Sequence, residues 1–235
     1  MKRFGKEEAL ALLKKYGISP AVMEHIMAVR DYAVEIAGDI DCDRELVEVG
    51  ALLHDIGRSR SHDIDHAIIG AGILKDEGVD DRIVKIVERH IGAGLTPDEA
   101  KKLGLPPADY VPKTIEEKIV AHADNLIGNN ERVSIKDTIS MARRKWFASS
   151  VGRLIEFHYE VFRPEKVILT EPVCSDNGNG LDLMKKALDK KLKDMDILYR
   201  LNIDGDRYVV SLHGRDAGSA KDLLIKDMGA EPFSA

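Results

Sequence analysis

The chain has 235 residues, of which 44% are hydrophobic and 32% charged, with a formal net charge of −6. This composition fits one large domain or a domain plus a small module, and the acidic balance excludes a general charge-driven nucleic-acid binder while leaving room for a local basic patch. No apolar run approaches the roughly 18 residues of a membrane span. Two cysteines are too few for a disulfide framework. We therefore expect a cytoplasmic protein with no membrane partner.

Residues 1 to 161 are predicted to form helices joined by short loops. An early start signal is Ser19-Pro20, an N-cap serine followed by proline at the first helical position. After it, apolar side chains recur at helical spacing along one stripe: Val22, Ile26, Val29, Ala33 and Ile36. His25 lies at the edge of that stripe, one turn before Val29.

A second helix is expected over residues 44 to 56, ending in the sequence ALLHDIG. Gly57 is a natural C-terminal stop for this helix. His54 and Asp55 would then occupy the final turn of an almost wholly apolar helix. A charged side chain there is costly unless it is paired or bound to a metal.

Two further helices are predicted over residues 66 to 77 and 81 to 90. His66 opens the first of them and His90 ends the second. One or two more helices are expected to fill residues 135 to 161.

Two capping boxes mark further helix starts. Thr96 to Glu99 is a box with proline at the first helical position, and Thr114 to Glu117 repeats the pattern. In the helix that Thr114 opens, Asp124 lies four residues after Val120, so we expect its side chain on the core side.

The sequence changes character after Arg163-Pro164. The order predicted there is a strand over residues 166 to 174, a turn at 176 to 180, a helix over 181 to 195, two strands flanking Asp204-Gly205, and a helix over 217 to 228. The expected fold class is therefore mainly α: a helical domain over residues 1–161, followed by a small α+β module of β-α-β-β-α order over residues 164–235.

Imidazoles and carboxylates are spread over the successive helical segments in a pattern that suggests one site once the chain folds. The candidates are His25, His54, Asp55, His66, His90 and Asp124. The His-Asp dipeptide alone indicates little, because His62-Asp63 has the same letters. The order, spacing and helical context of the other ligands are what indicate a site.

This pattern resembles the HD superfamily of metal-dependent phosphohydrolases. ALLHDIGR is similar to that family's central motif, with His25 before it and Asp124, in AHADNL, after it. His66 and His90 match the two extra histidines of the family's binuclear members. The resemblance covers about residues 20 to 130 and implies a helical HD-type domain with a metal-dependent phosphohydrolase activity.

Neutral imidazoles and carboxylates suit divalent metals, and we predict two ions without distinguishing Fe, Mn, Co, Ni, Zn or Mg. Because a carboxylate has two oxygens, Asp55 is the expected bridge. The expected partition places His25, His54 and Asp124 on one ion, with the remaining pair, His66 and His90, on the other.

The predicted reaction is attack of a metal-bound hydroxide on phosphorus in a nucleotide or oligonucleotide phosphoester or phosphoanhydride. Asp55 and His54 are the predicted catalytic residues, and Arg58 is assigned to the substrate phosphate because its fork of donors suits that group. A solvated arginine at a helix end is the alternative for Arg58. One of His62, Asp63 and Asp65, in the loop before residue 66, could serve as a general acid, but a solvated polar loop is favoured.

Two other functions stay open. The same ligand set would support a di-iron oxygenase such as inositol oxygenase, which would consume dioxygen. A non-catalytic nucleotide- or RNA-linked sensor or adaptor would bind a nucleotide without turning it over, and an RNA contact would then fall to residues 164–235. The one basic cluster with an aromatic residue runs from Arg143 to Trp146; a helix surface with Trp146 turned into the core is favoured over nucleic-acid contact. The oligomeric state is not predicted.

Overall fold

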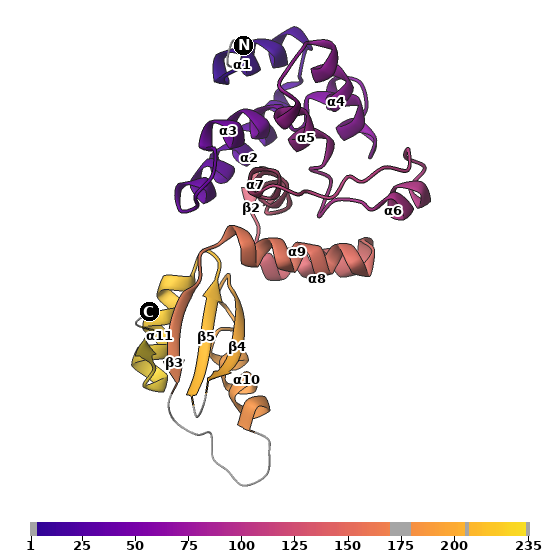
Figure 1. Cartoon of the computed structure of the whole chain (residues 1–235). Coiled ribbons are helices and arrows are strands. Elements are labelled where there is room, and N and C mark those ends of the chain that lie inside the picture. The colour runs from indigo at the N-terminus through magenta and orange to yellow at the C-terminus, as the bar shows by residue number, and fades with distance from the viewer. Residues whose placement is uncertain (1–3, 170–179, 205–206, 234–235) are drawn as a thin grey trace. The chain divides into compact units, whose positions relative to one another are not determined.

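The computed structural model describes residues 4–169, 180–204 and 207–233 (Figure 1). The chain divides into two compact units, residues 1–161 and 162–235. The first unit is helical and the second combines a sheet with helices, so the predicted fold class is confirmed. Within the described residues, no helix is long and apolar enough to cross a membrane.

Helices build almost the whole of the first unit. They are α1 (Lys6–Lys15), α2 (Pro20–Gly38), α3 (Arg44–Leu53), the 3-10 helix η1 (Ile56–Ser59), α4 (His66–Asp76), α5 (Asp81–Glu88), α6 (Pro97–Lys102), α7 (Ile115–Asn125), α8 (Ile135–Lys145) and α9 (Ala148–Val161). A short hairpin of β1 (Ile127–Gly128) and β2 (Glu131–Arg132), which was not predicted, follows α7.

The residues predicted to start helices are N-cap residues in the structure. The hydroxyls of Ser19 and Thr96 accept hydrogen bonds from backbone N–H groups in the first turns of α2 and α6, and the Thr96 capping box is complete. Thr114 caps α7 in the same way. Its predicted capping box is only half formed. The Glu117 carboxylate accepts a hydrogen bond from the backbone N–H of Lys113 and not from that of Thr114.

Helix α3 packs against α1, α2, α5 and α7. Its first turn carries exposed Arg44 and Glu45, but its second half, from Val49 to Leu53, has only apolar residues and glycine, and all of them are buried. A helical stretch that is hydrophobic all round has to lie inside the core. The residues that directly follow α3 therefore begin in the middle of the bundle.

The end of this helix differs from the prediction. Helix α3 ends at Leu53, His54 is its C-cap, and Asp55 lies in the turn before η1. Gly57 does not stop the helix; it lies in η1, where an added Cβ would be 1.9 Å from the backbone oxygen of His66. The absence of a side chain thus lets η1 touch the start of α4, which brings His66 towards Asp55. Similarly, α5 ends at Glu88, so His90 lies in the loop after it rather than in the helix.

A buried ionic network fixes the loop between α5 and α6. Arg153 of α9 donates hydrogen bonds to the carbonyl oxygens of Ala93 at 3.0 Å and Gly94 at 2.8 Å, and to the Glu99 carboxylate at 2.7 Å. Burial opposes ionisation of Glu99, but hydrogen bonds from Ser149, Arg153 and the backbone outweigh it and lower the pKa of Glu99 to about 2. Arg153, which holds the loop carbonyls, is therefore paired with a carboxylate that stays ionised well into acid.

Glu99→Gln should destabilise the first unit at neutral pH by about 1–3 kcal/mol, the usual effect of losing a charge-assisted hydrogen bond. The pKa of Glu99 is lower in the folded state than its ordinary value of 4.5, so its stabilisation is complete above that pH and fades as the pH falls towards about 2. Urea unfolding at pH 7 and in acid measures the difference. Asp98→Asn, at an exposed position of the same helix, is the control; an equal loss for Glu99→Gln at both pH values would contradict this account.

The second unit is a four-stranded antiparallel sheet with two helices packed on it. Its elements are β3 (Glu165–Leu169), α10 (Gly180–Lys191), β4 (Leu198–Asp204), β5 (Arg207–His213), α11 (Ala217–Met228) and β6 (Glu231–Pro232), with strand order β4-β5-β3-β6. The predicted β-α-β-β-α order is thus followed by one short additional strand, β6. The predicted hairpin is present, since Asp204 pairs with Arg207. Of the turn predicted at 176 to 180, only Gly180 is among the described residues, and it begins α10. The predicted strand beyond Leu169 lies outside the described residues.

Candidate metal centre

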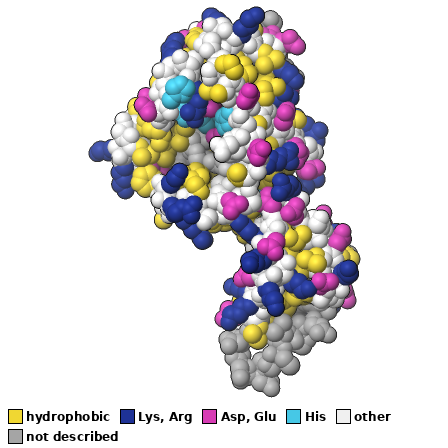
Figure 2. All heavy atoms as spheres, turned by 180° about the vertical axis from the view of Figure 1, so that it is seen from behind, with side chains coloured by type: hydrophobic (Ala, Val, Ile, Leu, Met, Phe, Trp, Pro, Cys, Tyr) yellow, Lys and Arg dark blue, Asp and Glu magenta, His cyan; other side chains and the backbone are white. Residues whose placement is uncertain are grey.

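The candidate ligands meet in the first unit although they span a hundred positions of sequence. His25 lies on α2, His54 and Asp55 follow α3, His66 begins α4, His90 follows α5, and Asp124 lies near the end of α7. In Figure 2, histidine side chains reach the surface of the first unit close to carboxylate and basic side chains. The cluster is therefore built from five segments that the fold of this unit brings together.

Asp55 lies at the centre of the cluster and is almost fully buried. Its Oδ2 atom is 3.6 Å from Nε2 of His54 and 3.8 Å from Nε2 of His25. Its Oδ1 atom is 3.1 Å from Nε2 of His66 and 3.6 Å from Nε2 of His90. Each carboxylate oxygen thus faces a different pair of histidines, which is the arrangement of a carboxylate that bridges two cations.

Asp124 completes one side of the cluster. Its Oδ1 atom lies 2.9 Å from Nε2 of His25 and 3.7 Å from Nε2 of His54. Burial works against its ionisation, but the hydrogen bond with His25 and the nearby His54 lower the pKa of Asp124. The carboxylate therefore lies with the first histidine pair, as the predicted partition requires.

Three of the histidines are held in a single tautomer by the backbone. Nδ1 of His54, of His66 and of His90 lies 2.7, 2.6 and 2.7 Å from the carbonyl oxygen three residues earlier. A carbonyl oxygen only accepts hydrogen bonds, so each Nδ1 carries the proton and each neutral ring has its lone pair on Nε2. Backbone contacts of this kind are how proteins orient metal-binding imidazoles.

These lone pairs converge without a donor between them. Nε2 of His66 lies 3.1 Å from Nε2 of His90, and both face Oδ1 of Asp55. Nε2 of His54 and Oδ1 of Asp55 are buried and have no hydrogen-bond partner within the described part of the chain. Leaving such atoms unsatisfied costs free energy, so a proton or a metal cation has to lie among them.

The ionisation states of His54 and Asp55 suit a metal. Burial lowers the pKa of His54 to about 4, so its ring is neutral at pH 7. Burial alone would raise the pKa of Asp55, but the surrounding histidines, His54 foremost, outweigh it and hold that pKa well below its usual range. Two groups, His25-His54-Asp55 and Asp55-His66-His90, each bring their ligand atoms close enough to hold an ion. The residues present therefore fit divalent metal.

Comparison with known proteins agrees with this geometry. The HD domain family model matches residues 22–129. An uncharacterised protein of Methanocaldococcus jannaschii is 49% identical over 162 residues, which cover 66% of this chain and 95% of that protein. The chain belongs to the HD domain family.

Two relatives with named activities are also similar to this HD protein. A tRNA (cytidine(56)-2'-O)-methyltransferase of Thermoplasma volcanium is 48% identical over 153 residues, or 65% of this chain and 45% of that protein. Ribonuclease Y of Acidothermus cellulolyticus is 30% identical over 162 residues, or 66% of this chain and 30% of that protein. The chain spans less than half the length of these two relatives.

In this HD domain Arg58 is tied to the cluster rather than solvated. Its Nε atom donates a hydrogen bond to Oδ2 of Asp55 at 2.6 Å, and its side chain is 30% exposed. The guanidinium therefore orients the central carboxylate from the solvent side. No hydrogen bond from either Nη atom is present among the described residues, and the side chain is partly open to solvent.

The remaining histidines of the HD domain lie apart from the cluster. His62 is exposed in the loop before α4, in line with the prediction of a solvated polar loop. His122 is fully buried, with Nε2 at 3.0 Å from Nδ1 of His158 on α9. Both rings therefore belong to the helical core. Sequence reasoning missed the carbonyls that orient the clustered rings, because their position depends on where each helix ends.

Proposed function

We propose that this HD protein is a metal-dependent phosphohydrolase that acts on a nucleotide or oligonucleotide phosphoester or phosphoanhydride. The observation that carries the proposal is Asp55, whose two oxygens each face a separate histidine pair. Membership of the HD domain family supports a hydrolase. The names of its relatives, a ribonuclease and a tRNA-modifying enzyme, favour an RNA-derived substrate.

Two divalent ions are proposed to be held on either side of Asp55. His25, His54 and Asp124 would bind one, and His66 and His90 the other. Such ions supply a water of lowered pKa and stabilise the negative charge that builds on a phosphoryl group. Neutral imidazoles around them leave a net positive charge, which makes an anion site inside an acidic protein.

The side chains of this chain prepare the site before substrate arrives. The backbone carbonyls behind His54, His66 and His90 keep each Nε2 lone pair aimed at the centre. Burial keeps His54 neutral at pH 7. Arg58 holds the bridging carboxylate and places a positive charge where a phosphate would enter.

An RNA contact through residues 164–235 stays part of the proposal. Three exposed cations lie on one face of the sheet: Lys166, Arg200 and Arg207. The first two each pair with Ser211 across the strands, and the third lies four residues before Ser211 on the same strand, so all three share its face. Positive charge on one face is the feature that attracts a phosphate backbone. Asp204, which pairs with Arg207, and Glu231, which pairs with Ile168, lie on the same face. The three cations therefore support an RNA partner only as a local cluster beside two carboxylates.

The function is tested with the full chain loaded separately with Mn, Fe, Co or Ni. We expect hydrolysis of at least one member of a panel of cyclic dinucleotides, oligoribonucleotides and nucleoside polyphosphates, with release of a phosphomonoester or phosphate. Dioxygen consumption with a non-phosphorylated substrate would instead indicate the oxygenase. Metal-loaded protein that binds nucleotide but hydrolyses none of the panel would contradict a phosphohydrolase and favour the sensor.

Arg58→Ala should raise the KM for the phosphoester about tenfold or more, because a charge-assisted hydrogen bond to an anion contributes roughly 1.5–3 kcal/mol. Arg58→Lys keeps the positive charge but lacks the planar pair of donors, so its KM should lie between those of the wild type and Arg58→Ala. Arg60→Ala, at an exposed neighbouring arginine, is the control. If Arg58→Ala instead loses metal in proportion to activity, Arg58 only positions Asp55 and does not bind substrate.

A further inference from the structure

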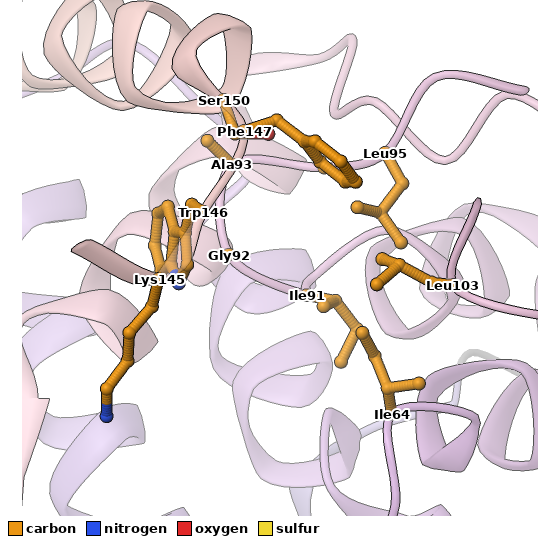
Figure 3. A pocket seen from close by; sticks show the side chains of 11 residues that line it. Ile64, Ile91, Gly92, Ala93, Leu95, Leu103, Lys145, Trp146, Phe147 and Ser150 are labelled. Atoms are coloured by element: carbon orange, nitrogen blue, oxygen red, sulfur yellow. The ribbon is translucent and has the colours of Figure 1, made fainter. Parts of the chain in front are cut away.

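A cavity of about 300 Å³ lies on the first unit (Figure 3). The side chains that give it its character are mostly apolar and include two aromatic rings: Ile64, Ile91, Leu95, Leu103, Trp146 and Phe147. In Figure 3 these side chains surround one space, and that of Lys145 extends away from it. Trp146, expected in the core, is half-buried and lines this cavity instead.

One wall of the cavity comes from the loop that follows His90, a candidate metal ligand. Ile91 directly follows His90, so their Cα atoms are about 3.8 Å apart. Asn125 directly follows Asp124 and donates a hydrogen bond from Nδ2 to the carbonyl oxygen of Gly92 at 2.8 Å. The loop that supplies one wall of the cavity is thus tied to ligands on both sides of the centre.

The loop and the indole that form part of the cavity wall pack on each other. Gly92 has a φ of +56°, and an added Cβ there would lie 3.3 Å from the ring of Trp146, so the indole packs directly on the loop backbone. Arg153 donates hydrogen bonds to the next two carbonyl groups of the same loop. These contacts give this part of the wall a defined shape.

The rim combines exposed apolar side chains with cations. Ile64 is 37% exposed and Leu103 is 39% exposed, and large apolar side chains left open beside a concave surface are a mark of a ligand site. Nζ of Lys102 lies 5.7 Å from the centre of the Phe147 ring. The site thus offers aromatic and apolar contacts inside, with the ammonium group of Lys102 next to one of the rings.

These features point to one occupant. The volume is at the lower end for small-molecule sites, so it suits one ring system rather than a helix or several nucleotides. Aromatic side chains take up unpaired bases by stacking. We infer that this cavity receives one nucleobase of the phosphoester whose phosphate is held at the metal centre, an inference that rests on the proposed function.

The single tryptophan of the chain makes the occupant directly measurable. In the full chain loaded with Mn, titration with adenosine monophosphate should change the fluorescence of Trp146 saturably, because the base stacks near the indole. Ribose 5-phosphate, which has the phosphate and the sugar but no base, should leave the fluorescence unchanged. An equal response to both probes would overturn the inference.

A matched pair of substitutions tests the place of binding. Leu103→Gln alters an exposed leucine of the rim, and Leu183→Gln alters a leucine of similar exposure, 39% against 42%, in the second unit. Leu103→Gln should weaken the fluorescence titration at least tenfold, with Phe147→Ala doing the same, while Leu183→Gln should have no effect. An unchanged affinity in both cavity variants would overturn the inference.

The readout separates this inference from the proposed function. Hydrolysis of phosphoesters without a base-dependent change in Trp146 fluorescence would support the proposed function and contradict base binding in the cavity. A base-dependent change without hydrolysis would support base binding in the cavity and contradict the proposed function.

Discussion

Asp55→Ala should remove metal from both halves of the centre and abolish phosphoester hydrolysis together. Among the described residues, Asp55 is the carboxylate whose oxygens face both histidine pairs, at 3.1 to 3.8 Å from four imidazole nitrogens. Losing both ions removes several kcal/mol of transition-state stabilisation, which corresponds to a fall in kcat of about a thousandfold or more. Metal content by mass spectrometry and turnover by product release measure the two effects on one preparation.

Two comparison variants sharpen this result. His66→Ala removes a ligand from only one side, so it should lower the metal content by one ion and leave His25, His54 and Asp124 occupied. Asp76→Ala, at an exposed carboxylate on α4, should change neither metal content nor turnover. Full metal loading of Asp55→Ala, or normal turnover without metal, would contradict the bridging role.

Gly57→Ala should destabilise the first unit and open the centre between η1 and α4. An added Cβ would lie 1.9 Å from the backbone oxygen of His66 and 2.7 Å from the backbone nitrogen of Gly70, and neither atom can move without moving α4. Overpacking usually costs about 1–3 kcal/mol, and contact with backbone atoms places this case at the upper end. Because His66 would move away from Asp55, we also expect weaker binding of the second ion.

Gly72→Ala is the matched control, since it lies on α4 and an added Cβ there meets nothing within 4 Å. Alanine in a helix interior is favoured over glycine by roughly 0.5–1 kcal/mol, so this variant should be slightly more stable than the wild type. Thermal unfolding with and without metal compares the two. Wild-type stability and metal affinity in Gly57→Ala would show that the turn can shift without disturbing the centre.

Local patterns in the sequence were enough to predict most of the helical unit. Helical spacing of apolar residues predicted α2, and the capping residues Ser19, Thr96 and Thr114 marked three helix starts to the residue. Such signals are local and chemical, so they survive in any tertiary context. The boundaries that were wrong, at Leu53 and Glu88, are helix ends where tertiary packing decides the last turn.

The candidate ligands could be named from their order and spacing, and the structure brings them together. The way they are held could not be predicted. The carbonyls behind His54, His66 and His90 depend on the turn that follows each helix, and the place of Gly57 depends on how closely α4 approaches it. The cavity beside Trp146 was also missed, because its walls come from loops and helix ends that carry no periodic pattern.

Metal content of the purified full chain tests the central claim most directly. Inductively coupled plasma mass spectrometry, before and after incubation with Mn, Fe, Co or Ni, should find two divalent ions per chain, one for each histidine pair around Asp55. Removing them with a chelator should lower the melting temperature, because the buried Nε2 of His54 and Oδ1 of Asp55 lose their partner. A chain that binds no divalent metal under any of these conditions, and melts at the same temperature with chelator, would contradict the account.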